Sequence, residues 1–359
     1  MRHRTLVVAL ALVLCGAAIH GAPQATQSAQ TPAQAGQKPA QPAVQAPPAQ
    51  RPPQPGAEGP RRPAPTLPAS QGPPEYGPLK GTLVIVGGGN TQGTGIVEKF
   101  IELAGGPEKK FIIVPTAGGN KNPDGTIKEY KEEQVVGSWI KRGLKGVKML
   151  HTADPKVADT EAFVKDLREA DAVWFDGGRQ WNIVDSYANT LTEKEFHKVL
   201  ERGGVIAGSS AGATIQGDYL VRGDTSGAGV MMTQEKNHQH GFAFLRNSAI
   251  DQHNNTRQRW DDLDEVIAKM PNLLGIGLSE GTAIIVKGDT FEVMGKWKVA
   301  IHDNQRLYQP WEKTFYVLQA GDVYDMKARR VIKLGIGASP APPPPQRDQQ
   351  SPPASPRPR

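Results

Sequence analysis

Cysteine is almost absent from this chain of 359 residues. Its one cysteine, Cys15, lies in an apolar segment near the N-terminus. If that segment is removed as a signal peptide, the mature chain contains no cysteine. A chain without cysteine can form no disulfide bond and has no thiol nucleophile.

Proline is scarce in the middle of the chain, although the sequence contains 31 prolines. Fifteen of them lie within residues 23–77 and nine within residues 340–358, and these flanks hold few large apolar residues. Such segments cannot bury enough surface to offset the entropy of ordering, so we expect disordered linkers at 23–77 and 338–359. The remaining residues, 78–337, are enough for one domain with a sizeable core.

The predicted domain also lacks an excess of charge. The formal net charge is +6, but residues 78–338 carry 33 basic and 33 acidic side chains, so the excess lies in the flanks. A domain that binds nucleic acid needs a basic stripe on its folded surface. The charge distribution therefore argues against nucleic acid as a partner. We interpret the basic flanks as solvated spacers.

No apolar run of the sequence is long enough to span a membrane. The run at residues 5–14 has ten residues, whereas a membrane-spanning helix needs roughly 20. Basic residues precede this run and small residues follow it, which predicts a signal peptide at residues 1–22 and a secreted or periplasmic protein. A lipoprotein signal at Cys15 is the minor alternative, because Leu14 is too large for the residue before a lipidated cysteine.

The middle of the chain alternates buried strands with amphipathic helices. The predicted strands lie at 82–86, 111–115, 147–151, 172–175 and 205–207, and the predicted helices at 96–104, 135–142, 161–169, 193–202 and 211–218. This pattern predicts a three-layer α/β fold, with a mostly parallel sheet and helices on both faces. After Asp251, short strands predict an antiparallel extension of that sheet; they lie at 283–286, 291–294, 298–301, 315–318 and 331–334.

The sharpest motif is Gly208-Ser-Ser-Ala-Gly212, between a predicted strand and a predicted helix. This is the G-x-S-x-G turn in its required context. The glycines allow a tight turn that exposes Ser210, and the N–H groups that follow face a developing oxyanion. Without catalysis, the same residues would form a glycine-rich turn or a phosphate cradle at a helix N-terminus.

A serine nucleophile needs a base, and His253 is the best placed histidine. It closes the sequence Asp251-Gln-His253 at the end of a predicted strand. Glu280 ends another predicted strand, where it either orients the base or simply caps a turn. The order Ser, His, Glu excludes an ordinary α/β-hydrolase, in which the acid precedes the histidine.

Together these motifs resemble the cyanophycinase and dipeptidase E group of serine peptidases. Val84-Ile-Val-Gly-Gly-Gly89, Pro115-Thr-Ala117 and Phe175-Asp-Gly-Gly-Arg-Gln180 fit the same group, and the resemblance covers nearly all of residues 78–337 in the right order. It implies a fold like that of class I glutamine amidotransferases, with serine in place of their cysteine. It also implies cleavage of cyanophycin, a poly-aspartate with arginine on each side chain, to β-Asp-Arg dipeptides.

The resemblance also implies a role for individual residues. Ser210 would be the nucleophile, His253 the general base and Glu280 its orienting acid. The N–H groups of Gly178 and Ala211 would form the oxyanion hole. The residues that would hold substrate are Gln180, Asp251, Gln252, Arg257 and Arg259. Guanidinium groups suit the carboxylates of an aspartate chain, and no metal or cofactor is implied.

Three positions depart from the pattern of this group. Asp262 stands where a third arginine is usual, Asn254 where phenylalanine follows the histidine, and Ser279 where aspartate precedes the acid. The triad is intact, but the substrate stays open between cyanophycin and another aspartyl or isoaspartyl peptide.

Two alternatives come from other functional classes. A non-catalytic binding protein with an amidotransferase-like pocket is disfavoured, because all three triad residue types are present at matching strand ends. A metalloenzyme would use His238, His240, Asp251 and His253, but no HExxH or Cys/His pattern supports it. The sequence does not decide whether the protein is a monomer or a homodimer.

Overall fold

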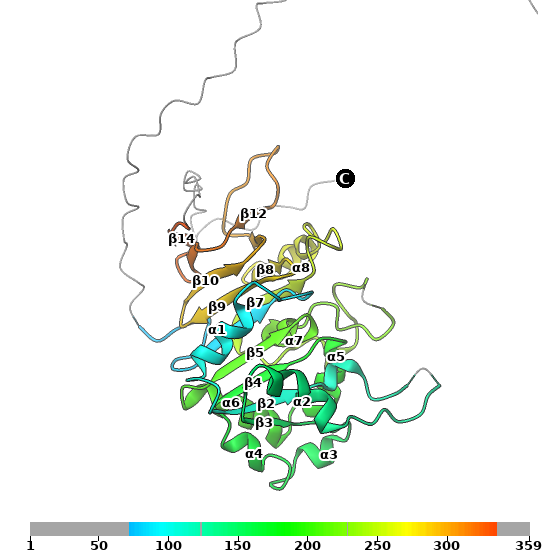
Figure 1. The fold of residues 1–359 in the computed structure, drawn as a ribbon. Coiled ribbons are helices and arrows are strands. Elements are labelled where there is room, and N and C mark those ends of the chain that lie inside the picture. The colour runs from blue at the N-terminus through cyan, green and yellow to red at the C-terminus, as the bar shows by residue number, and fades with distance from the viewer. Residues whose placement is uncertain (1–71, 123, 228, 336–359) are drawn as a thin grey trace, which may run out of the picture. The chain divides into compact units, whose positions relative to one another are not determined.

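The computed structural model describes residues 72–122, 124–227 and 229–335 (Figure 1). The predicted signal peptide with Cys15, most of the predicted linker and the predicted C-terminal tail lie outside the described residues. Within the described ranges, every helix is too short or too polar to cross a membrane.

A nine-stranded sheet forms the centre of the domain, in the order β14-β13-β10-β9-β1-β5-β4-β2-β3. The parallel strands are β1 (Thr82–Val86), β5 (Val205–Ser209), β4 (Ala172–Phe175), β2 (Lys110–Val114) and β3 (Gly146–Met149). The antiparallel strands are β9 (Thr282–Lys287), β10 (Thr290–Gly295), β13 (Val323–Asp325) and β14 (Arg330–Lys333). This confirms the predicted parallel core with an antiparallel extension.

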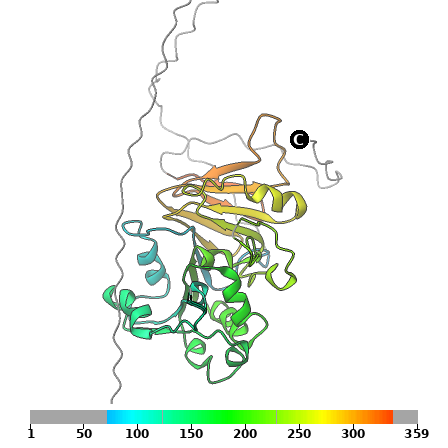
Figure 2. The same ribbon diagram turned by 90° about the vertical axis from the view of Figure 1, so that its right-hand side faces the viewer.

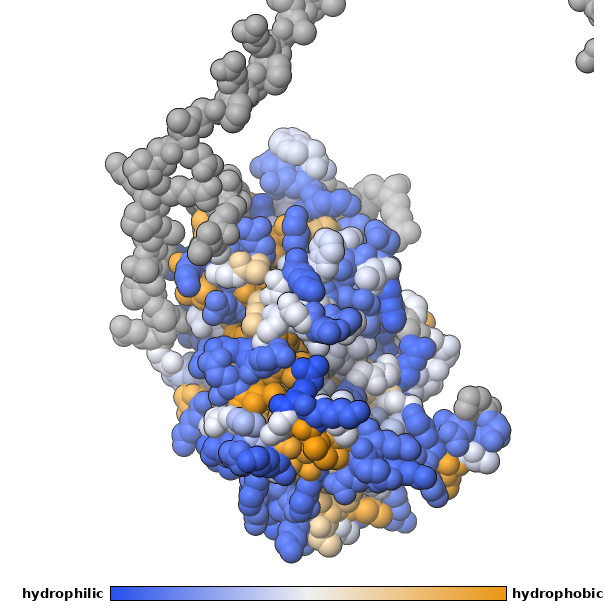
Figure 3. All heavy atoms as spheres, in the orientation of Figure 1, coloured by the Kyte–Doolittle hydropathy of each residue, from blue (hydrophilic) through white to orange (hydrophobic). Residues whose placement is uncertain are grey.

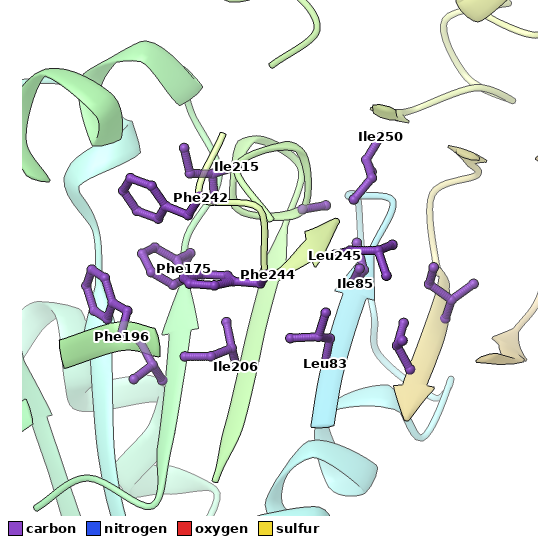
Figure 4. Close-up of a cluster of buried hydrophobic side chains, with 14 of the residues drawn as sticks. Leu83, Ile85, Phe175, Phe196, Ile206, Ile215, Phe242, Phe244, Leu245 and Ile250 are labelled. Carbon is purple, nitrogen blue, oxygen red and sulfur yellow. The ribbon is translucent and has the colours of Figure 1, made fainter. Parts of the chain in front are cut away.

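Helices cover both faces of the parallel strands, because successive side chains of a strand point to opposite faces. The helices are α1 (Ile96–Leu103), α2 (Glu132–Lys141), α3 (Pro155–Ala158), α4 (Lys165–Arg168), α5 (Gln180–Tyr187), α6 (Leu191–Glu201), α7 (Ala211–Thr214) and α8 (Leu263–Lys269). Trp174 of β4 packs against Phe100 of α1 on one face. Its neighbour Phe175 packs against Phe196 of α6 on the other (Figure 4). The predicted three-layer arrangement is confirmed.

A second sheet of five strands shares the core on the α6 side, in the order β12-β11-β8-β7-β6. Its strands are β6 (Gly217–Tyr219), β7 (Leu245–Gln252), β8 (Leu274–Leu278), β11 (Val299–Asp303) and β12 (Phe315–Leu318). Leu245 and Ile250 of β7 lie in one hydrophobic cluster with Leu83 and Ile85 of β1 (Figure 4). In Figure 2 the yellow and orange strands gather in the upper part of the domain, and the cyan and green helices in the lower part.

The structure corrects the sequence prediction in three places. Strands β11 and β12, which we expected in the extension of the first sheet, belong to the second sheet, because a strand pattern does not specify its partner. The helix predicted at 211–218 ends at Thr214, where β-branched residues and Gly217 disfavour its continuation. Within the helix predicted at 161–169, only α4 is helical.

The packed chain begins before the predicted boundary at Pro78. Tyr76 is 5% exposed and belongs to the main hydrophobic cluster. Its hydroxyl accepts a hydrogen bond of 2.7 Å from Arg329. Asp289 accepts hydrogen bonds from the backbone N–H groups of Glu75 and Tyr76, at 2.7 and 2.8 Å. The domain therefore includes residues that the proline-rich composition had assigned to the linker.

The face of the domain shown in Figure 3 is largely hydrophilic, and its hydrophobic residues form separate, smaller areas. The large aromatic side chains are mostly inside, and Phe100, Phe111, Phe175 and Phe196 are fully buried. Burial of these side chains follows from their large apolar surface.

Candidate active site

Ser210 lies on a sharp turn between β5 and α7. Its backbone has φ 58° and ψ −115°, a strained conformation for a residue other than glycine. Gly208 and Gly212 make the turn possible. A Cβ atom on Gly208 would lie 2.2 Å from the carbonyl oxygen of Gly212, and one on Gly212 would lie 2.1 Å from that of Phe175. The turn therefore fixes the Ser210 hydroxyl at the carboxyl end of the parallel strands.

His253 and Glu280 complete a chain of contacts with Ser210. The distance from Ser210 Oγ to His253 Nε2 is 2.8 Å, and that from His253 Nδ1 to Glu280 Oε1 is 2.5 Å. Thr256 Oγ1 also donates to Glu280 Oε1, at 2.9 Å. When Nδ1 donates to the carboxylate, Nε2 accepts from the serine hydroxyl. This is the arrangement in which a neutral histidine acts as a general base.

The two sheets share the triad between them. Ser210 follows β5 of the nine-stranded sheet, and His253 follows β7 of the five-stranded sheet. Glu280 lies between β8 and β9, where the chain passes from the second sheet to the first. The N–H group of His253 donates to the carbonyl of Gly87 after β1, at 2.9 Å, which ties the base to the first sheet.

Three successive glycines after β1 form the surface against which the base and the acid pack. A Cβ atom on Gly88 would lie 2.3 Å from His253 Cε1, and one on Gly89 would lie 2.4 Å from Glu280 Oε2. The φ angles of Gly88 and Gly89 are 102° and 69°, which other residues rarely adopt. These contacts give a physical reason for the Gly87-Gly-Gly89 motif.

The predicted oxyanion donors flank the nucleophile. Ala211 is the first residue of α7, directly after Ser210. Gly178 lines the same cavity as Ser210, and a Cβ atom on it would lie 2.0 Å from the carbonyl oxygen of Ala117. Within the described ranges, neither the Gly178 nor the Ala211 N–H group donates to a protein acceptor. Two such groups are what a tetrahedral oxyanion requires, so the oxyanion hole stays our prediction for them.

Burial and charge tune the base and the acid. Burial lowers the pKa of His253; the hydrogen bond to Glu280 opposes this effect, and the charges of Arg257 and Arg259 add to it. The imidazole is therefore neutral near neutral pH and can accept a proton. Partial burial raises the pKa of Glu280, but hydrogen bonds from His253 and Thr256 outweigh it, so the pKa lies below its ordinary value.

A polar cavity of about 130 Å³ opens beside the nucleophile. It is lined by Gly178, Arg179, Gln180, Ser210, Arg222, Gln252, Arg257 and Arg259. Four of the five residues predicted to hold substrate are in this lining, and the four arginines favour an anionic group in the cavity. A larger cavity of about 690 Å³, near Leu79, His197 and Phe242, is lined by none of the predicted site residues.

Asp251 is the predicted substrate-binding residue that does not line the cavity. Its fully buried carboxylate pairs with the Arg222 guanidinium, through Nε at 2.9 Å and Nη2 at 3.1 Å. Asp251 thus holds an arginine of the cavity wall, and its contact with substrate stays a prediction. Gln180 lines the cavity, but its Nε2 donates to the carbonyls of Val221 and Arg222, at 2.7 and 2.8 Å.

Sequence analysis missed two arginines of the cavity wall. Arg222, in the loop after β6, is 3% exposed and also pairs with Asp262 through Nη2. No motif marks this loop, so the sequence contains no signal for Arg222. Arg179 is different, because it stands between Gly178 and Gln180, both of which were predicted to act. Its position between two predicted site residues could therefore have predicted that Arg179 lines the cavity.

The histidines of the metalloenzyme alternative do not converge. His238 Nδ1 lies 2.7 Å from Glu235 and its Nε2 lies 2.7 Å from Asp185, whereas His253 contacts Ser210 and Glu280. In the part of the chain that the structure describes, no group of three or more His, Cys, Asp or Glu side chains is placed to hold a metal ion. The contacts of His253 therefore fit a base for Ser210 better than a metal ligand.

Known proteins resemble this chain over most of the described domain. A sequence model described as peptidase family S51 matches residues 83–294. The cyanophycinase of Geminocystis herdmanii is 26% identical over 238 residues, which is 64% of this chain and 83% of that protein. The cyanophycinase of Synechococcus elongatus is 24% identical over 269 residues, 70% of this chain and 81% of that protein. A solved peptidase from an acI-B1 actinobacterium has the same fold, with a TM-score of 0.52, 23% identity, and coverage of 70% of this chain and 98% of that chain.

Proposed function

The chain belongs to peptidase family S51 and is a serine-type peptidase, and we propose that its substrate is cyanophycin, which it hydrolyses to β-Asp-Arg dipeptides. The observation that carries the proposal is the contact chain from Ser210 through His253 to Glu280, next to a cavity walled by four arginines. Cyanophycin displays a free arginine carboxylate on every side chain, which such a cavity suits. The cyanophycinases among the curated relatives support the same substrate.

We propose an acyl-enzyme mechanism on this geometry. His253 Nε2 takes the proton of Ser210 as Oγ attacks the scissile carbonyl carbon, and the ionised Glu280 stabilises the imidazolium that forms. The N–H groups of Gly178 and Ala211 stabilise the oxyanion. His253 then gives the proton to the leaving amine, and the C–N bond breaks. A water molecule, deprotonated by His253, hydrolyses the ester on Ser210 and restores the enzyme.

The direct test is incubation of the purified protein with cyanophycin, with products identified by mass spectrometry. We expect the β-Asp-Arg dipeptide, and none from the Ser210→Ala variant. Hydrolysis of small isoaspartyl peptides without cyanophycin turnover would replace the substrate but keep the mechanism. Labelling of Ser210 by an active-site serine probe separates either outcome from a non-catalytic binding protein.

A related aspartyl or isoaspartyl peptide is the second candidate substrate. Asp262 favours it, because its pairing with Arg222 adds a negative charge where the resembled group usually has an arginine. Asn254 and Ser279, the other departures, are both fully buried beside the triad residues. They therefore alter the surroundings of the base and the acid more than the cavity wall.

We also propose that the protein is exported. The basis is the basic, apolar and small-residue order of residues 1–22. Expression of the full chain in its host, followed by fractionation and N-terminal sequencing, is expected to give a processed protein outside the cytoplasm. An unprocessed protein in the cytoplasm would contradict export without touching the peptidase activity.

A further inference from the structure

The cavity beside Ser210 holds more positive charge than the protein neutralises. Arg179, Arg222, Arg257 and Arg259 line it. Asp251 and Asp262 are the carboxylates paired with these arginines in the described ranges, and Arg222 binds both. Arg259 shares Asp251, with 3.9 Å between its Nη1 and Oδ1. The two remaining guanidinium groups carry the surplus.

Arg179 and Arg257 are these remaining groups. Both are exposed, and neither has a carboxylate within ion-pair distance among the residues that the structure describes. Arg259 is 12% exposed, and its Nη1 also contacts Gln252, which limits its freedom to meet a ligand. The charge that faces the opening therefore belongs to Arg179 and Arg257.

Arg179 is held at the cavity wall and is not a freely moving surface side chain. Its N–H group donates to the carbonyl of Ala117 at 2.7 Å, which fixes its backbone beside Gly178. Its guanidinium lies over the ring of Trp181, 5.4 Å from the ring centroid. Stacking of this kind restricts an arginine while leaving its N–H groups available in the plane.

We propose that Arg179 is a specificity-determining residue, which together with Arg257 binds a free carboxylate of the substrate next to the scissile bond. Two guanidinium groups at one opening suit a carboxylate, which accepts hydrogen bonds on both oxygens. Arg179 also directly follows Gly178, the predicted oxyanion donor, and both line the cavity that contains Ser210, so the carboxylate and the reacting carbonyl share that cavity. The inference rests on the proposed function for its substrate, but it also makes a prediction about binding that does not require turnover.

The test measures binding in the Ser210→Ala background, where no hydrolysis takes place. The ligands are the β-Asp-Arg dipeptide, the same dipeptide with its arginine carboxylate amidated, and the same dipeptide with its aspartate α-carboxylate amidated. Titration calorimetry gives the dissociation constant of each. Arg179→Gln is added to this background, with Arg330→Gln, an exposed arginine of β14, as the matched control for loss of one charge.

We expect Arg179→Gln to weaken binding of the free dipeptide about ten- to a hundredfold, as loss of a charged hydrogen-bonded contact does. For one of the two amidated ligands the effect should fall below about threefold, which identifies the carboxylate that Arg179 binds. Arg179→Lys keeps the charge but lacks the planar fork of arginine. Its dissociation constant for the free dipeptide should therefore lie between that of the Ser210→Ala parent and that of the Arg179→Gln variant. Arg330→Gln should match the parent.

Two results would overturn the inference. One is an unchanged affinity for the free dipeptide after Arg179→Gln, and the other is an equal loss for all three ligands. Absence of dipeptide binding by the Ser210→Ala parent would overturn it as well. The proposed function fails by a separate result, namely no turnover of cyanophycin by the unmodified protein, which leaves a carboxylate preference in the binding data intact.

Discussion

The two sheets of the domain contribute different chemistry to one site. The nine-stranded sheet supplies the nucleophile after β5 and the loop with Gly178 after β4. The five-stranded sheet supplies the base after β7 and, through the following loop, Arg257 and Arg259. The nucleophile thus comes from one sheet and the base from the other, while both sheets contribute arginines to the cavity, since Arg179 also follows β4. The difference teaches that activity depends on the fit between the sheets as much as on either one.

Removing the nucleophile tests the first sheet and has the largest expected effect. Ser210→Ala should lose about 10⁴-fold or more in kcat and stay folded, because the members of a triad act as a unit. Ser209→Ala, one residue earlier in β5, is the matched control and should be far milder. Steady-state hydrolysis and circular dichroism measure both. A reversed order of the two effects would place the nucleophile at Ser209.

Removing Arg222 tests how the second sheet stabilises the buried carboxylate of Asp251, the residue of β7 that pairs with it. Arg222→Met would remove the close partner of the fully buried Asp251 and leave it with Arg259, whose Nη1 lies 3.9 Å from Oδ1, so we expect a loss of about 3 kcal/mol in the free energy of unfolding. Lys269→Met is the control, because its pair with Glu265 is exposed and contributes less than about 1 kcal/mol. Urea denaturation measures both. A similar small loss in the two variants would contradict the role of Arg222.

Asp262→Arg extends the same test. It would restore the arginine that is usual at this position in the resembled group, but it would also place two guanidinium groups against each other. We therefore expect it to destabilise the fold. Urea denaturation of this single variant measures the loss, and an unchanged free energy of unfolding would contradict the expectation.

Gly88→Ala tests the contact between Gly88, after β1 of the first sheet, and His253, after β7 of the second sheet. The added Cβ atom would lie 2.3 Å from the His253 ring, so the base must shift, and we expect a loss of about 10²-fold in kcat. Gly93→Ala is the control, since Gly93 also has a positive φ, 68°, but has no atom within 4 Å of the added Cβ. Equal losses in kcat would attribute the effect to backbone strain and not to the contact with His253.

Arg257→Gln should change the pH dependence without abolishing activity. The positive charge of Arg257 lowers the pKa of His253, so its removal raises that pKa. The base works in its neutral form, and the acidic limb of kcat/KM should therefore move to higher pH. An uncharged ester substrate keeps the carboxylate subsite out of the measurement, and Arg330→Gln is the control. A limb that stays in place or moves to lower pH would contradict the electrostatic role.

The triad could be predicted because its signals are local. Ser210 has a glycine on each side of its turn, and His253 and Glu280 each follow the end of a buried strand. The carboxyl ends of neighbouring parallel strands meet at one edge, which brings His253 after β7 close to Glu280 after β8. Ser210 follows β5 of the other sheet, and the packing of the two sheets brings it to His253. The parallel core of the fold followed from the same alternation of buried strands and helices.

What the sequence could not predict depends on partners far along the chain. Arg222 meets Asp251 and Asp262, 29 and 40 residues later, and only the packed structure brings them together. The second sheet was missed because strand patterns carry no information about which strands pair. Tyr76 was assigned to the linker because it stands at the end of a proline-rich stretch, although it packs into the core.

The position of Glu280 on the crossing between the sheets has a consequence for heat stability. Only residues 279–281 separate β8 from β9, and the Lys296 N–H donates to the carbonyl of Gly281 at 3.1 Å where the chain crosses back. A small slip of one sheet over the other would displace the acid from His253 before any strand separates. Activity should therefore fail on warming at temperatures where the far-ultraviolet circular dichroism still reports an intact fold, and it should return on cooling.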